Sequence, residues 1–137
     1  MHPSDHFSPP QGLPAGEGRL EVICGPMFSG KTEELMRRIR RAHIAKLPVA
    51  LFKPATDTRY DTVEVISHDK NSMNSTVVKS SEALWKHIQD ASQREPGRRE
   101  GYSIVAVDEA QFFDENLPQV CNALANQGYR VIVALSL

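Results

Sequence analysis

Two glycines, a lysine and a threonine at fixed spacing mark the part of this sequence best suited to bind phosphate. They match the pattern G-x-x-x-x-G-K-S/T, in which converging backbone N–H groups surround an anion. In this arrangement the lysine ammonium meets the outer phosphates and the threonine hydroxyl ligates Mg²⁺. The pattern predicts a nucleoside triphosphate site; the alternative is a purely structural glycine-rich turn. The eight residues are Gly25, Pro26, Met27, Phe28, Ser29, Gly30, Lys31 and Thr32.

An acidic pair, Asp108 and Glu109, directly follows the apolar run 104–107. Because ligands bind beyond the carboxyl ends of the strands of a parallel sheet, we expect Asp108 beside the phosphate loop, within reach of Mg²⁺ held by Thr32. Glu109 can then accept a proton from an attacking oxygen. The alternative makes both residues surface acids at the end of a strand. The spacing does not choose between an ATPase, in which water attacks, and a kinase, in which a substrate hydroxyl attacks.

The elements that must position these residues alternate between strand and helix. An apolar run at 20–24 precedes the loop, and a helix is expected at 31–46, with an apolar stripe at Leu35, Ile39 and Ala42. Ser81 is expected to cap a second helix. The polar stretch 55–79 is expected to be a loop with one short strand. The pattern predicts an α/β fold with a mostly parallel sheet covered on both faces. The predicted strands are 20–24, 48–54, 63–66, 102–107 and 130–135, and the later helices begin at Ser81 and span 117–126.

Length and composition fit one domain with a hydrophobic core. The chain has 137 residues and a net charge of −1, which gives no overall attraction to nucleic acid or to an anionic membrane. Residues 1–18 hold four prolines and three glycines and are predicted to be a disordered tail, before a folded core at 19–137. Both cysteines, Cys24 and Cys121, are expected to be buried thiols in a reducing cytoplasm, and they do not form a zinc ribbon.

The motifs together resemble those of cytosolic-type thymidine kinases. The resemblance spans about residues 19–134 in the same order and at similar spacing. It implies a P-loop NTPase (RecA-like) core of three layers, with transfer of the γ-phosphoryl group of ATP to the 5′-hydroxyl of thymidine and Mg²⁺ as the metal ion. Tetramers are usual in the family. The matching segments are residues 25–32, 34–38, 57–60, 68–69 and 107–113.

The resemblance also implies roles for single residues. Glu109 falls at the family's catalytic base, and Lys31 and Arg59 supply positive charge to the transferred phosphoryl group. Met27 and Phe112 fall near the nucleoside. On sequence alone, the favoured interpretation of Arg59 is an exposed loop cation, and Met27 and Phe112 are equally core residues. The segments that match nucleotide-contacting positions besides the phosphate loop are Asp57, Thr58 and Arg59, and Asp108, Glu109, Ala110 and Gln111.

The resemblance differs at the end of this sequence. Family members continue past the last strand into a four-cysteine zinc subdomain and a long loop that closes over thymidine, and residues 134–137 depart from the family's pattern. The cysteine ligands of that zinc site are absent here. We therefore expect this chain to bind ATP and to phosphorylate thymidine poorly or not at all. The alternatives are an inactive ATP-binding fragment, a truncated subunit of such a kinase, and an ATPase of RecA type.

Overall fold

The computed structural model describes residues 18–26, 29–55, 63–66, 72–93 and 101–137. The predicted tail lies outside these residues except for Gly18. Five predicted site residues also lie outside them, namely Met27, Phe28, Asp57, Thr58 and Arg59.

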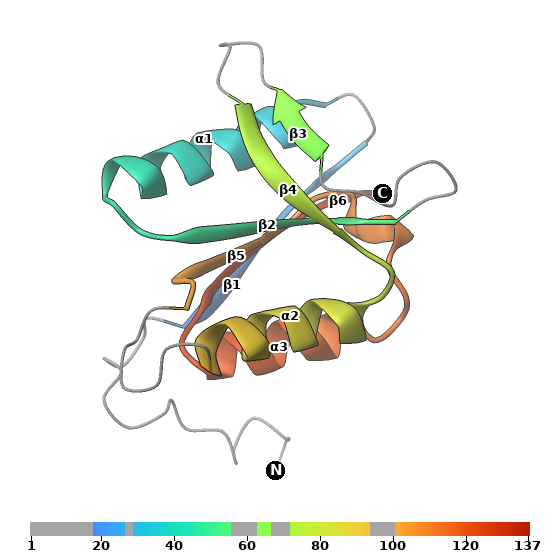
Figure 1. Ribbon diagram of the computed structural model, residues 1–137. Coiled ribbons are helices and arrows are strands. Elements are labelled where there is room, and N and C mark those ends of the chain that lie inside the picture. The colour runs from blue at the N-terminus through green and yellow to red at the C-terminus, as the bar shows by residue number, and fades with distance from the viewer. Residues whose placement is uncertain (1–17, 27–28, 56–62, 67–71, 94–100) are drawn as a thin grey trace.

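The described strands form a six-stranded sheet in the order β1-β6-β5-β2-β4-β3 (Figure 1). Four of the five strand pairings are parallel, and only β3 runs antiparallel to its neighbour β4. The predicted α/β fold with a mostly parallel sheet is confirmed. The strands are β1 (Arg19–Gly25), β2 (Val49–Pro54), β3 (Val63–Ile66), β4 (Ser72–Val78), β5 (Ile104–Val107) and β6 (Arg130–Ser136).

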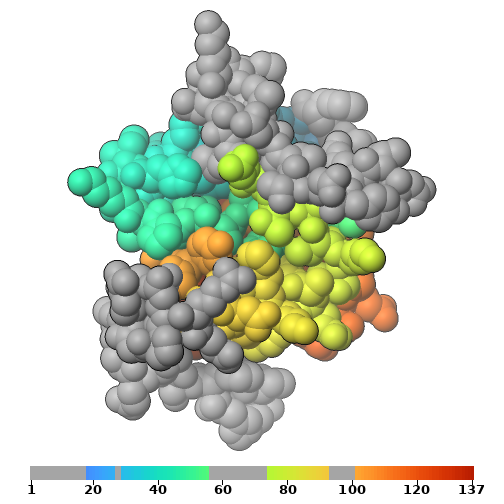
Figure 2. Space-filling view, viewed as in Figure 1, coloured from blue at the N-terminus to red at the C-terminus, as the bar shows by residue number. Residues whose placement is uncertain are grey.

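Helices cover both faces of the sheet and give the molecule three layers. Helix α1 (Lys31–Ile44) lies on one face, and α2 (Ser81–Gln93) and α3 (Leu117–Asn126) lie together on the other (Figure 1). The space-filling view shows α1 and α2 on either side of the strands (Figure 2). Each face has its own hydrophobic core. Helix α1 buries the predicted stripe, Leu35, Ile39 and Ala42, together with Met36.

The central strands owe their position to uninterrupted apolar sequence. All four residues of β5 are at most 1% exposed, since both faces of this strand lie under helices. The loop after β1, the start of α1 and the acidic pair after β5 therefore meet at the carboxyl edge of the sheet. No helix in the described parts of the chain is both long and apolar enough to cross a membrane.

Two expectations about single elements are wrong. Strand β4 lies inside the stretch that was expected to be a loop. Its first five residues are mostly polar, and it pairs with β2 and β3 and buries Val78 in the core. The side-chain cap of α2 comes from Ser80, whose hydroxyl accepts a hydrogen bond from the Ala83 N–H at 3.0 Å. Ser81 is already the first residue of the helix and bonds Asp114 instead.

The two cysteines differ in their surroundings. Cys121 is buried in the core beside α2, and burial raises its pKa to about 12. Cys24 is exposed, against expectation. Among the described strands β1 pairs only with β6 and forms an edge of the sheet, so the face that carries Leu20, Val22 and Cys24 is incompletely covered. Both thiols are free, as expected.

Candidate active site

The phosphate-binding loop turns at glycine. Gly30 has φ 84° at the N-cap of α1, a left-handed conformation that favours glycine. At Gly25, an added Cβ would lie 3.0 Å from the Ser29 hydroxyl, so the loop closes tightly over this position. Lys31 lies over the loop, and its ammonium donates to the Pro26 carbonyl at 2.5 Å and contacts the Ser29 hydroxyl at 3.4 Å. The N-terminus of α1 behind the loop adds positive potential, which suits phosphate binding.

Asp108 and Glu109 extend from the end of β5 toward this loop. Asp108 is 4% exposed, and its backbone N–H donates to the Phe52 carbonyl on β2 at 2.9 Å. Its carboxylate accepts a hydrogen bond from the Glu109 N–H at 2.9 Å, and Thr32 lines the same pocket. Burial raises the pKa of Asp108, and the ammonium of Lys53, the Glu109 N–H and the Thr32 hydroxyl oppose that rise. Glu109 has φ 53°, which is uncommon for a residue with a side chain.

A lysine on the neighbouring strand completes the charged cluster. The Lys53 ammonium lies 3.3 Å from Oε2 of Glu109 and 3.8 Å from Oδ2 of Asp108. Sequence reasoning missed Lys53, although it obeys the rule that located Asp108. It is the cation near the carboxyl end of an otherwise apolar parallel strand, β2, which pairs with β5.

The turn after the acidic pair is a short 3₁₀ helix, Ala110–Phe112, which the sequence did not predict. Ala110 is buried in the core. The Gln111 side chain accepts a hydrogen bond from the Ser136 N–H at 2.9 Å and so ties this turn to the end of β6. Phe112 is 58% exposed, so its ring is not a core residue. An exposed ring beside the site is available to contact a ligand.

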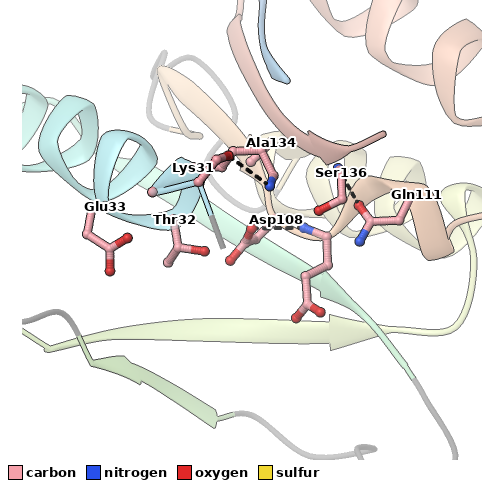
Figure 3. A pocket seen from close by; sticks show the side chains of 10 residues that line it. Lys31, Thr32, Glu33, Asp108, Gln111, Ala134 and Ser136 are labelled. Atoms are coloured by element: carbon pink, nitrogen blue, oxygen red, sulfur yellow. Dashed lines mark hydrogen bonds between the residues drawn. The ribbon is translucent and has the colours of Figure 1, made fainter. Parts of the chain in front are cut away.

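These groups surround a pocket of about 300 Å³ (Figure 3). Figure 3 shows Lys31 and Thr32 from α1 gathered with Asp108 from β5 and with Gln111 and Ser136. The predicted loop and the predicted acidic pair are therefore brought together. Glu33, Ala134 and Ser136 were not predicted to be part of the site. The lining consists of residues 29–33, Asp108, Glu109, Gln111, Ala134 and Ser136.

The donors at this pocket suit Mg²⁺ better than zinc. Asp108 and Thr32 offer hard oxygen ligands in the lining of the same pocket. Mg²⁺ commonly takes one or two protein oxygens and completes its shell with water and substrate phosphates. In the described parts of the chain, no group of three or more His, Cys, Asp or Glu side chains is arranged to hold a metal ion.

Comparison with known proteins places this geometry in a family. The model of the thymidine kinase family matches residues 18–136. The chain belongs to the thymidine kinase family. The curated thymidine kinases of Bacteroides fragilis, Porphyromonas gingivalis and Rhodothermus sp. are each 51% identical to it over 117 residues. These matches cover 85% of this chain and 50–53% of the relatives, so the chain spans about half the length of the curated relatives it matches.

A solved structure shares the fold. The ATPase DotB of Legionella pneumophila superposes with a TM-score of 0.53 at 18% sequence identity. The superposition covers 95% of this chain and 36% of DotB. At this identity the likeness concerns the fold alone.

Proposed function

We propose that the protein is an ATP-dependent thymidine kinase, which transfers the γ-phosphoryl group of ATP to the 5′-hydroxyl of thymidine. The observation that carries the proposal is the pocket that gathers the phosphate loop, Thr32 and Asp108, in a chain of the thymidine kinase family. Phosphoryl transfer depends on positioning and charge neutralisation more than on covalent chemistry. The pocket gathers the groups that this task requires.

The phosphate loop and Lys31 hold the triphosphate, and Asp108 and Thr32 hold Mg²⁺. When bound, the metal neutralises developing charge on the phosphates. Glu109 accepts the proton of the thymidine hydroxyl as its oxygen attacks the γ-phosphorus, and ADP leaves. Gln111 is well placed to contact the nucleotide because its side chain lines the pocket.

The remaining predicted site residues complete the proposal. Phe112 contacts the nucleoside, in keeping with its 58% exposed ring. The other members lie outside the described residues and are proposed on the family resemblance: Met27 toward the nucleoside, and Asp57, Thr58 and Arg59 toward the nucleotide, with Arg59 also stabilising the transferred phosphoryl group. A cytoplasmic location and a homotetramer are proposed on the same ground. We propose no zinc site within these 137 residues.

The test is incubation of the 137-residue protein with labelled thymidine and Mg·ATP, followed by separation of the nucleotides. Thymidine monophosphate should form slowly, in proportion to the ADP released, and only when Mg²⁺ is present. Lys31→Ala provides the inactive reference, and Lys86→Met, on the exposed surface of α2, provides a control for surface lysines. ADP and inorganic phosphate released at the same rate without thymidine would instead identify an ATPase.

A further inference from the structure

Lys53 belongs to the site by its position in the sheet. Strand β2 lies between β5 and β4, and Phe52 is in register with Val107. Lys53 is therefore level with Asp108, and the hydrogen bond from the Asp108 N–H to the Phe52 carbonyl fixes the two backbones together. The Lys53 side chain is only 13% exposed, so it is held among these elements rather than extended into solvent.

The surroundings of Lys53 explain why an ammonium is stable there. Removing an ammonium from water costs several kcal/mol unless an anion compensates for the lost hydration. Lys53 has carboxylates at 3.3 Å (Glu109) and 3.8 Å (Asp108), and the hydrogen bond goes to Glu109. The contact with Glu109 is thus the shorter of the two. In the sheet, β5 and β6 lie between β2 and β1. Lys53 therefore approaches Glu109 from the side opposite the strand that precedes the phosphate loop.

Glu109 needs such a partner in order to have one fixed direction. Its side chain is 35% exposed and rotates about three bonds, so it loses conformational entropy on being held. The adjacent Asp108 carboxylate repels it. Lys53 contacts both carboxylates and offsets the repulsion between them, with the shorter contact to Glu109.

We infer that Lys53 is a positioning residue, which orients the Glu109 carboxylate for its role as base. The inference rests on the proposed function and extends it to a residue to which no role has been given. Lys53 acts through Glu109 in this scheme and does not itself bind the transferred phosphoryl group. Phosphate binding by Lys53 is the competing explanation, and the two explanations predict different behaviour in a double-mutant cycle.

The kinetic experiment compares Lys53→Met, Glu109→Gln and the double variant in thymidine phosphorylation. Lys53→Met should lower kcat about 10–100-fold, which is part of the roughly 10²–10⁴-fold that a general base contributes. The KM for ATP should change by less than about threefold, since nucleotide contacts are kept. In the Glu109→Gln background, Lys53→Met should have little further effect. Independent, multiplicative losses would overturn the inference, because Lys53 would then act without Glu109.

Two further variants separate positioning from folding. Lys53→Arg keeps the positive charge and should recover part of the kcat that Lys53→Met loses, whereas Lys86→Met should leave kcat unchanged. If Lys53→Met and Lys53→Arg were equally inactive while both remained folded by circular dichroism, the charge of Lys53 would not be what matters. That result also contradicts the inference.

An NMR measurement tests the contact between Lys53 and Glu109 without any substrate. In protein carrying ¹³C- and ¹⁵N-labelled lysine, the Cε and Nζ signals of Lys53 are assigned by their loss in Lys53→Met. They should shift in Glu109→Gln and stay in place in Glu115→Gln. Unchanged Lys53 signals in Glu109→Gln would overturn the inference whether or not the protein phosphorylates thymidine. Shifted signals in a protein that forms no thymidine monophosphate would contradict the proposed function and leave Lys53 as the group that fixes Glu109.

Discussion

At the scale of single residues, the candidate base has an unusual backbone. Glu109 has φ 53°, in the left-handed region, where a Cβ costs about 1–2 kcal/mol. Its N–H donates to the Asp108 carboxylate at 2.9 Å, a bond that maintains this conformation. Strained backbone of this kind concentrates at functional sites, where the surrounding structure enforces it. The fold therefore gives up some stability in order to direct this side chain.

This strain predicts that a glycine at position 109 gives a protein at least as stable as an alanine does. Glu109→Gly and Glu109→Ala both remove the carboxylate, but only alanine keeps a Cβ in the left-handed region. Urea denaturation should show the glycine variant to be as stable as the alanine variant or more stable, by up to about 1 kcal/mol. At an ordinary position, alanine is favoured instead. An alanine variant clearly more stable than the glycine variant would show that Glu109 carries no backbone strain.

At the scale of elements, the Asp114 carboxylate joins the segment after the 3₁₀ helix to α2. Asp114 accepts hydrogen bonds from the Ser81 N–H at 2.8 Å, the Ser81 hydroxyl at 2.6 Å and the Asn116 N–H at 3.2 Å. The hydroxyl of Ser81 is the main reason that the pKa of Asp114 is lowered. The segment after the 3₁₀ turn is thereby fixed to the first residue of a helix.

Removal of this carboxylate should weaken the protein. We expect Asp114→Ala to lower the free energy of unfolding by about 1 kcal/mol, as for the loss of a helix cap. Glu115→Ala, at the next exposed position, should change it by less than about 0.5 kcal/mol. The measurement is equilibrium unfolding in urea at neutral pH. Equal stability of the two variants would mean that the bonds of Asp114 do not hold α2.

The sequence predicts those elements whose local pattern agrees with their surroundings. Strand β5 is an uninterrupted apolar run, and α1 has a clear buried stripe, so both are correctly located. Strand β4 could not be found this way, because its sequence is mostly polar and its pairing with β2 and β3 is not visible in local pattern. The exposure of Cys24 has the same origin, since it depends on which strand lies at the edge of the sheet. The order of the strands in a sheet cannot be read from the local sequence pattern of each strand.

The same limit applies to the site. The phosphate loop and the acidic pair carry recognisable spacing, and their proximity follows from the geometry of a parallel sheet. Lys53 and Ser136 have no such motif. The register of β2 with β5 brings Lys53 beside Asp108 and Glu109, and Ser136 lines the pocket with its N–H bonded to Gln111. Sequence reasoning finds the groups that share a motif. It misses the residues that reach the site only through the pairing of strands.

At the scale of the whole molecule, a charged cluster ties the edge strand to the rest of the fold. Glu21 on β1 accepts hydrogen bonds from Arg130 on β6 at 2.7 Å and 3.0 Å and from Arg38 on α1 at 2.9 Å. Arg19 donates to the same carboxylate at 2.7 Å. The Arg130 bond is the main reason that the pKa of Glu21 is lowered to about 2. Three elements thus meet at a carboxylate whose side chain is 19% exposed.

This cluster predicts the acid sensitivity of the fold. Because the pKa of Glu21 is lower in the folded chain than its ordinary value of 4.5, its contribution is complete above pH 4.5 and is lost as the pH falls through about 2. The contribution is at most about 3 kcal/mol. Glu21→Gln should reduce stability at pH 7 and should flatten the fall in stability between pH 5 and pH 2. If urea titrations gave the same pH slope for Glu21→Gln, Glu115→Gln and the unaltered protein, Glu21 would not be the group responsible.

The proposed kinase activity requires the phosphate loop and the acidic pair to act together as a Mg·ATP site. Isothermal titration of ATP into the protein, with and without Mg²⁺, tests this most directly. We predict one site per chain that requires Mg²⁺, is lost in Lys31→Ala and persists in Lys86→Met, because Lys31, unlike Lys86, places a charge against the outer phosphates. Folded Lys31→Ala protein that bound ATP as tightly as the unaltered chain would contradict the account.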